Sequence, residues 1–130
     1  MKRPTWIDRG GLLLLHEETL AEHGGLSGLR DEAALGAALA RPRHVHAYEP
    51  TADAARLAAA YGFGIVRNHP FNDGNKRAGF LAIGLFLALN GFELVADQVG
   101  AVQTIMRLAA GHLTEQQLAE WVRSHSLRRI

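Results

Sequence analysis

The chain has 130 residues, of which 48% are apolar and 7% aromatic, and its formal net charge is +1. This length fits a single hydrophobic core, so we expect one domain over residues 1–130. The small net charge speaks against a surface specialised for direct contact with nucleic acid or membranes. The absence of cysteine excludes disulfides and thiolate metal sites.

Two features predict a cytoplasmic, soluble protein. The N-terminal region has no apolar stretch long enough for a signal peptide, because the run from Leu12 to Leu15 is too short. The apolar run from Ala78 to Leu89 is also shorter than the ~18 residues that a membrane-spanning helix needs. We therefore expect no membrane partner.

Six segments have the features of amphipathic or buried helices. Asp8, Asp31 and Asp97 are suitable N-caps, and Thr114 with Gln117 has the spacing of a capping box. In chain order, the predicted helices run from Asp8 to about His23, from Asp31 to Leu39, from Ala52 to Arg67, from Gly74 or Asn75 to Asn90, from Gln98 to Ala110, and from Thr114 to about His125.

The segments between and after these helices are expected to be irregular or extended. Pro42 should end the second helix, and the segment from Arg41 to Pro50 lacks helical periodicity, which predicts a short extended flap. The segment from Phe92 to Ala96 is a connector with possible extended character. The tail from Leu127 to Ile130 is expected to fray.

Together these elements predict a compact all-α fold. The fourth helix is apolar on nearly every face, so we expect it to be the buried central helix. The segment from Asn68 to Gly74 is expected to be a loop, because Pro70 disfavours a helical conformation at His69. This loop would then be mounted on the N-terminus of the core helix, which is a rigid place for chemistry.

The stretch from His69 to Arg77 combines a base, a carboxylate, an amide and two cations around a helix start. A helix N-terminus already carries partial positive charge, so cations in its first turn suggest an anion opposite them. Gly74 and Asn75 could point successive N–H groups at that anion. Lys76 and Arg77 would add full charges, and the planar fork of Arg suits phosphate oxygens.

Asp73 and His69 refine this anion site. A carboxylate beside a phosphate is repelled unless a cation lies between them, and Mg²⁺ resolves that conflict. His69, with a reference pKa of ~6.5, suits a general base. Base, metal ligand, phosphate cradle and positive clamp are the parts of a site for phosphoryl or nucleotidyl transfer.

Each residue also has a purely structural interpretation. Asp73 could be an N-cap and Gly74 a turn residue, while Lys76 and Arg77 could be solvated and His69 bonded to the backbone. Phe71 is expected to anchor the loop in the core. The functional interpretation is favoured because all these features coincide within one loop.

At this stretch the chain resembles the Fic/Doc family, whose signature is H-x-F-x-[DE]-G-N-[GK]-R. Every signature position is matched, by His69, Phe71, Asp73, Gly74, Asn75, Lys76 and Arg77. The resemblance covers nearly the whole chain. The first helix with His16, the following Gly24-Gly25, the turn from Gly28 to Asp31 and the Ala40-Arg41-Pro42 stop are similar to the Doc branch, the death-on-curing toxins. The resemblance implies the Fic fold, a compact helical bundle of about six helices with a short flap.

Two positions distinguish this chain from the adenylylating Fic enzymes, which have Gly in place of Lys76 and a second Arg in place of Phe80. That Arg helps to clamp the triphosphate so that the α-phosphate faces the target hydroxyl. Lys76 is similar to Doc, in which ATP binds in the reversed sense. Doc transfers the γ-phosphate to a threonine of elongation factor Tu and stops translation. The resemblance therefore implies a protein kinase that uses ATP and Mg²⁺.

The resemblance also assigns a role to each site residue. It makes His69 the base, Asp73 the Mg²⁺ ligand, Gly74, Asn75 and Lys76 the phosphate cradle, Arg77 the group that stabilises transferred charge, and Arg67 a further cation that could reach the same pocket. The segment from Arg41 to Pro50 corresponds to the flap that docks the target. An ordinary surface loop is the alternative for that segment.

A partner is implied as well. Many family members carry an inhibitory helix with [ST]-x-x-x-E-[GN], and this sequence contains no such motif. The resemblance therefore implies a separate antitoxin similar to Phd, whose C-terminal segment folds into an apolar groove of the toxin.

Three other interpretations remain open from the sequence. The chain could transfer AMP, which also requires His69, or it could be a non-catalytic module that binds an antitoxin. It could also be a metal protein that uses His44, His46 and His69, although no complete ligand set is evident. The remaining histidines are expected to be solvated or capping residues: His16, His23, His112 and His125.

Overall fold

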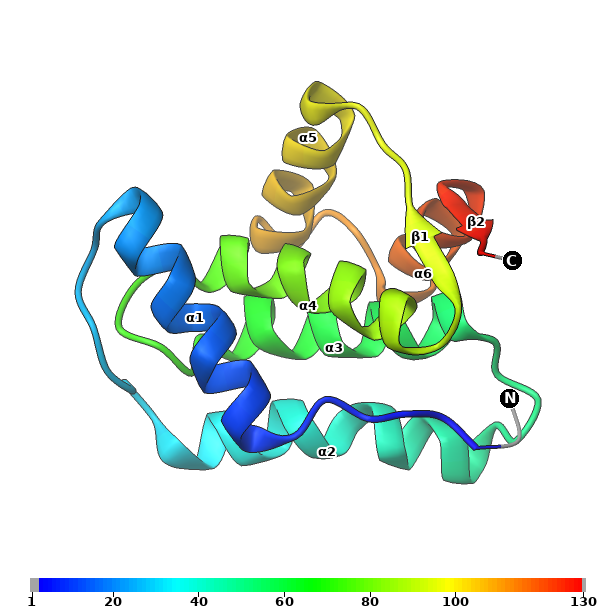
Figure 1. Ribbon diagram of the computed structural model, residues 1–130, viewed down its shortest axis with the longest axis horizontal. Helices are drawn as coiled ribbons and strands as arrows, with labels where there is room; N and C mark the ends of the chain where they lie inside the picture. Colours follow the sequence, from blue (N-terminus) through cyan, green and yellow to red (C-terminus); the bar gives the residue numbers. More distant parts are fainter. Residues whose placement is uncertain (1–2, 130) are drawn as a thin grey trace.

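A computed structural model describes residues 3–129 and confirms the all-α class (Figure 1). Within these residues the helices are α1 (Arg9–His23), α2 (Glu32–Tyr48), α3 (Ala54–Asn68), α4 (Asn75–Leu89), α5 (Gln98–Ala109) and α6 (Glu115–Ser124). Two short strands, β1 (Phe92–Leu94) and β2 (Ser126–Arg128), complete the described elements.

Side-chain caps explain where all but one of these helices begin. The capping side chains are those of Asp8, Asp31, Asp53, Asp97 and Thr114, and each accepts a backbone N–H of the first turn. The predicted capping box of Thr114 and Gln117 is present. Helix α4 differs, because its N-cap is Gly74 in a left-handed conformation and no side chain caps it.

Helix α2 continues through Pro42, so the expected helix end and the extended flap over residues 41–50 are both wrong. Leu35, Ala38 and Pro42 are buried, and Val45 packs against the core. Their spacing of three and four residues keeps one helix face turned inward on both sides of the proline. A proline costs about 3 kcal/mol in a helix interior, and the burial of this face offsets that cost.

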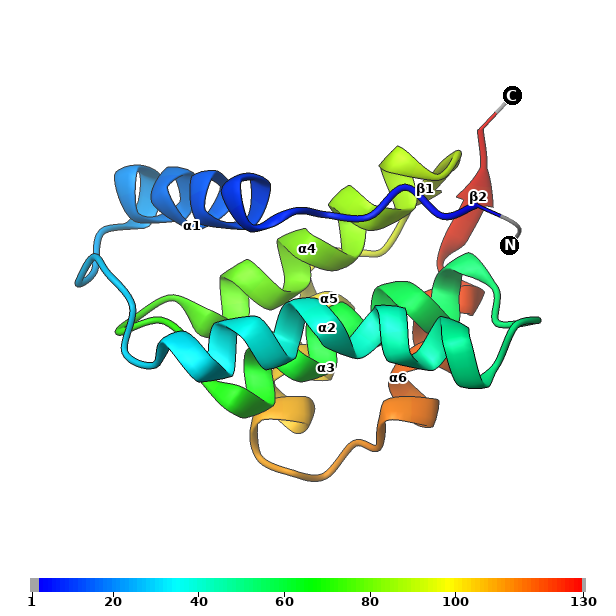
Figure 2. The same ribbon diagram turned by 90° about the horizontal axis from the view of Figure 1, so that it is seen from below.

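Helix α3, rather than α4, is the central helix. It packs against α2, α4 and α6. Figure 1 shows it between α2 and α4, and Figure 2, seen from below, shows α2 crossing in front of it. Eleven residues of α3 are buried, against seven of α4. The expectation that α4 is the buried central helix is therefore wrong. Its outward apolar side chains, such as Leu81 and Leu85, line surface grooves instead.

The C-terminal tail is also ordered where a frayed end was expected. Strand β2 pairs antiparallel with β1, with Leu127 opposite Glu93. The N–H of Arg129 donates to the carbonyl of Gly91 at 2.8 Å. Ile130 lies outside the described residues. Among the helices described, none combines the length and the apolar character required to cross a bilayer.

Two glycines allow α3 and α4 to pack closely. A Cβ atom added at Gly62 would lie 2.5 Å from Ile83 Cδ1, and one added at Gly79 would lie 2.5 Å from Val66 Cγ2. Real Cβ atoms do not approach other atoms this closely, so the glycines fix the distance between the two helices.

We predict opposite effects for two alanine substitutions in α4. Gly79→Ala should lower the free energy of unfolding by about 1–3 kcal/mol, because the new methyl group overpacks the α3 contact. Gly84→Ala should raise it by about 0.5–1 kcal/mol, because a Cβ there meets no atom within 4 Å and the unfolded chain loses freedom. Urea denaturation of both variants tests this pair. Equal effects would contradict the packing described here.

Candidate active site

The site loop, residues 69–74, connects α3 to α4 and begins in a strained conformation. His69 is the C-cap of α3 with φ 50° and ψ 58°, the only non-glycine residue of positive φ between residues 3 and 129. Such a conformation persists only when its surroundings hold it. Arg30 does so, because its Nε donates to the His69 carbonyl at 2.6 Å and its Nη2 to the Asn68 carbonyl at 2.8 Å. The guanidinium thereby satisfies carbonyls at the negative end of α3.

Backbone pairing with the α1–α2 connection holds the middle of the site loop. Leu29 forms an antiparallel bridge with Phe71. The Pro70 carbonyl accepts the N–H groups of Arg30 and Asp31 at 2.8 and 3.2 Å. The Asn72 N–H donates to the Gly28 carbonyl at 3.1 Å. The loop is therefore fixed along its length by a segment distant in sequence.

Asn75 links the start of α4 to His69. Its Oδ1 accepts the Phe71 N–H at 3.0 Å and its Nδ2 donates to the Phe71 carbonyl at 3.0 Å. These two contacts fix the orientation of the amide. The same Nδ2 lies 3.2 Å from His69 Nδ1. In the neutral ring, Nδ1 is therefore the acceptor and the proton resides on Nε2.

Asp73 does not cap α4, so its interpretation as an N-cap is wrong. Its Oδ1 accepts the Gly74 N–H at 2.9 Å, and its Oδ2 accepts the Leu26 N–H at 3.3 Å. The residue is exposed, and each carboxylate oxygen has a further lone pair available. The carboxylate can therefore still accept a cation.

No part of the described chain gathers three or more histidine, cysteine or acidic side chains that could hold a metal ion. The interpretation as a metal protein using His44, His46 and His69 is therefore wrong. His46 packs edge-on against the Trp6 ring, with 5.8 Å between the ring centroids. A divalent ion at Asp73 would need most of its ligands from elsewhere, such as phosphate oxygens and water.

The first turn of α4 carries two cationic side chains that form no ion pair within residues 3–129. Lys76 and Arg77 are exposed, and within residues 3–129 neither side chain has a hydrogen-bond or ion-pair partner. The first N–H groups of α4 also lack a side-chain cap. Free N–H groups, the helix dipole and two cations together make this end of α4 suited to an anion.

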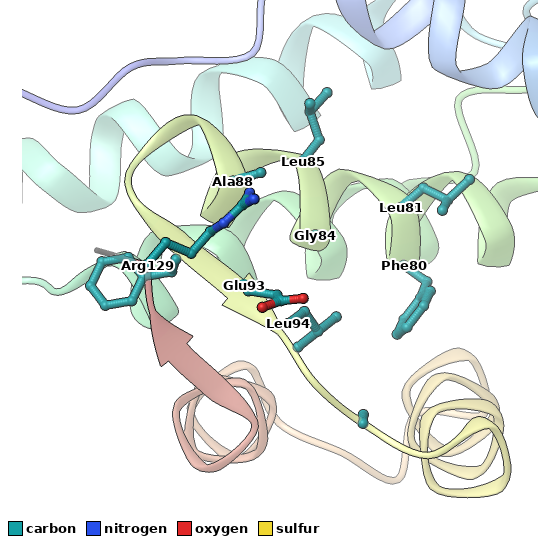
Figure 3. Close-up of a pocket in the computed structure, with 10 residues that line it drawn as sticks. Phe80, Leu81, Gly84, Leu85, Ala88, Glu93, Leu94 and Arg129 are labelled. Carbon is teal, nitrogen blue, oxygen red and sulfur yellow. The ribbon is translucent and has the colours of Figure 1, made fainter.

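Lys76 and Arg77 also line a surface groove, which we call the α1–α4–α5 groove. Its volume is about 720 Å³, and its apolar lining includes Phe80, Val102 and Met106. A second hollow of about 430 Å³ continues from it between α4 and β1, where Phe80 and Leu94 lie on opposite sides (Figure 3).

Arg67 has a different position from Lys76 and Arg77. Its guanidinium carbon is 5.7 Å from the centroid of the Phe63 ring. A Cβ atom at Gly111 would lie 3.6 Å from its Nη1, so the head group lies beside the α5–α6 turn. Arg67 is exposed and does not line the α1–α4–α5 groove. Its access to a bound phosphate stays a prediction.

His16 lies in the interior, so the expectation of a solvated or capping residue is wrong. His16 is only 2% exposed, and its Nε2 lies 2.7 Å from the Asp73 carbonyl oxygen. It follows Leu12 by four residues and precedes Thr19 by three, and both neighbours are buried. That helical spacing was a signal that His16 faces inward.

Comparison with known proteins agrees with the signature in the site loop. The family model described as "Fic/DOC family" matches residues 6–87. "Protein kinase doc" of Escherichia phage P1 is 31% identical over 112 residues, which cover 86% of this chain and 88% of the relative. "Toxin Doc" of Mycolicibacterium smegmatis is 42% identical over 78 residues, which cover 57% of this chain and 58% of the relative.

We predict that Arg30→Met lowers the free energy of unfolding by about 1–2 kcal/mol, because two carbonyls at the end of α3 lose a charged donor. Amide hydrogen exchange at His69 should also become faster. Arg9→Met is the matched control, since Arg9 pairs with Glu32 at the surface and its loss should cost about 0.5 kcal/mol or less. Unchanged exchange at His69 in Arg30→Met would contradict the anchoring role.

Proposed function

The chain belongs to the Fic/Doc family, in its Doc branch, and from this premise we propose that it is the toxin of a toxin–antitoxin pair. We propose further that it is an ATP-dependent protein kinase that phosphorylates a protein hydroxyl. The observation that carries the proposal is the uncapped start of α4, where Lys76 and Arg77 are unpaired beside the loop that holds His69.

The chemistry follows from these groups. The acceptor hydroxyl oxygen attacks the γ-phosphorus of ATP, the bond from that phosphorus to the β–γ bridging oxygen breaks, and ADP leaves. The hydroxyl proton passes to His69 Nε2. Lys76 and the N–H groups of α4 hold phosphate oxygens, and Arg77 stabilises the charge on the transferred group.

The tautomer of His69 adds a condition to this scheme. Nε2 can accept a proton only when the ring carries its own proton on Nδ1. The Asn75 amide donates to Nδ1 in this structure, so that contact must be lost in the reactive state. Catalytic hydrogen bonds are often arranged differently without substrate, so this change is compatible with the base role.

Asp73 is the residue suited to hold Mg²⁺. Both of its carboxylate oxygens accept one N–H each, which leaves lone pairs for a cation on an exposed side chain. When bound, Mg²⁺ would supply positive charge to the phosphates and so lower their repulsion of Asp73.

We assign the acceptor to a threonine of elongation factor Tu, the target of the Doc type, so that the modification would inhibit translation. The features within this chain that favour γ-phosphoryl over AMP transfer are Lys76 and Phe80. Phe80 occupies the place where adenylylating relatives have a second Arg, and it lines the α1–α4–α5 groove with an apolar ring.

A Phd-like antitoxin is the partner that we propose for the α1–α4–α5 groove. The groove lies between helices and is mainly apolar, which suits the apolar face of an amphipathic helix. Val102 and Met106 are both 54% exposed there, although they are large apolar side chains. The acidic residues Glu18 and Glu22 line the α1 wall and would favour basic residues on that side of the partner.

We predict that the purified chain transfers label from γ-labelled ATP, but not from α-labelled ATP, to elongation factor Tu. His69→Ala should abolish transfer because the base is lost, and EDTA should abolish it until Mg²⁺ is restored. Gel autoradiography measures the transfer. Transfer of label from α-labelled ATP would contradict the kinase activity and indicate a nucleotidyl transferase. If neither ATP transfers label, the chain acts only as a binding module.

For the partner, we predict that Val102→Glu weakens binding of the cognate antitoxin about tenfold or more, because a carboxylate would be buried in an apolar contact. Val99→Glu is the matched control. Val99 lies on the same helix and is 64% exposed, but it does not line the groove, so binding should change by less than about threefold. Isothermal titration calorimetry measures both, and equal losses would exclude the groove as the docking site.

A further inference from the structure

Helix α1 places two buried polar side chains beside the site loop, those of His16 and Thr19. The Thr19 hydroxyl donates to the His16 carbonyl of its own helix, whereas the His16 ring bonds to the loop. Burial of an imidazole is unfavourable unless its nitrogens find partners. Its Nε2 lies 2.7 Å from the Asp73 carbonyl oxygen. A carbonyl oxygen can only accept, so Nε2 carries a proton and donates it.

A second contact joins His16 to the same loop. Its ring stacks on the Phe71 ring with 3.7 Å between centroids and 7° between planes. Phe71 is fully buried, and its backbone N–H and carbonyl are both bonded to the Asn75 side chain. His16 therefore contacts the loop on both sides of Asn72.

The hydrogen bond from His16 to the Asp73 carbonyl fixes the orientation of a whole peptide group. The Asp73 carbonyl and the Gly74 N–H belong to one planar peptide group, so an interaction that fixes the carbonyl direction also fixes the N–H direction. That N–H donates to Asp73 Oδ1 at 2.9 Å, which ties the carboxylate to the same plane. Gly74 has φ 76° and ψ 18°, and glycine has many other conformations available. Local sterics alone therefore do not hold this peptide.

We propose that His16 is a positioning residue for the site. Its Nε2–H sets the Asp73–Gly74 peptide, and through it the direction of the Asp73 carboxylate and of the N–H groups that enter α4. This inference rests on the proposed function, because it assigns His16 to the same phosphoryl-transfer site. His16 itself is buried and does not line the α1–α4–α5 groove.

Three substitutions separate positioning from simple packing. His16→Phe keeps an aromatic ring on Phe71 but removes the donor. His16→Gln removes the ring but keeps an N–H donor of similar reach. Leu12→Val is the control for a loss of packing in α1, because Leu12 is fully buried one turn before His16 and its apolar side chain donates no hydrogen bond. Thermal melts establish that each variant is folded.

Steady-state γ-phosphate transfer to elongation factor Tu gives the first measurement. In His16→Phe, kcat should fall about 10- to 100-fold while KM for ATP stays within about twofold, as expected for misplaced reacting groups. His16→Gln should have a kcat at least about fivefold above that of His16→Phe. Leu12→Val should keep the wild-type kcat. Wild-type kcat in His16→Phe, or equal losses in folded Gln and Phe variants, would overturn the proposal.

NMR of the full chain tests the same proposal without activity, so its result is independent of whether the kinase function holds. The wild-type His16 ring should be the Nε2–H tautomer. The Gly74 amide resonance should shift or broaden in His16→Phe and stay nearer its wild-type position in His16→Gln. An Nδ1–H tautomer in the wild type, or a Gly74 amide unaffected by His16→Phe, would overturn the positioning role. If the wild-type chain transfers no phosphate while these NMR results are as expected, only the proposed function is contradicted.

Discussion

The chain has to leave α3 and enter α4 through a loop that is left-handed at both ends, at His69 with φ 50° and at Gly74 with φ 76°. Backbone in this region is disfavoured for a histidine and is only one of many choices for a glycine. Other groups must therefore hold the loop, and they do so mainly through its carbonyls. Arg30 binds the carbonyl of His69, Asn75 that of Phe71 and His16 that of Asp73. The geometry of the proposed chemistry depends on these three contacts.

The same arrangement leaves α4 without a side-chain cap. Asn75 uses its amide on Phe71 and His69, and Asp73 turns its carboxylate to Leu26 and its own peptide. The N–H groups at the start of α4 remain available, and two unpaired cations follow directly. In the other described helices an Asp or Thr side chain fills this position. An unneutralised positive helix end is unfavourable alone and becomes favourable when phosphate binds.

Helix α1 takes part in both proposed functions of the molecule. One of its faces presents His16 to the site loop, while Glu18 and Glu22 line the groove assigned to the antitoxin. A partner bound in the groove would contact the helix that holds the Asp73–Gly74 peptide. It would also lie against Lys76 and Arg77, which line the same groove.

Local signals explain what could be predicted from the sequence. The capping residues and the glycine stops predicted the helix positions, and the signature predicted a candidate site at the start of α4. Tertiary packing explains what could not. Pro42 lies inside α2 because its helix face is buried, and β2 is ordered because it pairs with β1. The charge of Glu115, only 6% exposed, is matched by Arg41 and Arg56 from helices distant in sequence. The burial of His16 is not evident from the residue type alone, and only its spacing from Leu12 and Thr19 on one face of α1 indicates it.

We propose that the uncapped start of α4 and its two cations orient ATP for attack on the γ-phosphorus. The nucleotide released during modification of elongation factor Tu tests this claim most directly, and phosphorus NMR of the reaction mixture identifies it. We expect ADP in equal amount to the modified acceptor, with no pyrophosphate. Pyrophosphate as the product would contradict it, because the α-phosphorus would then have been the atom attacked.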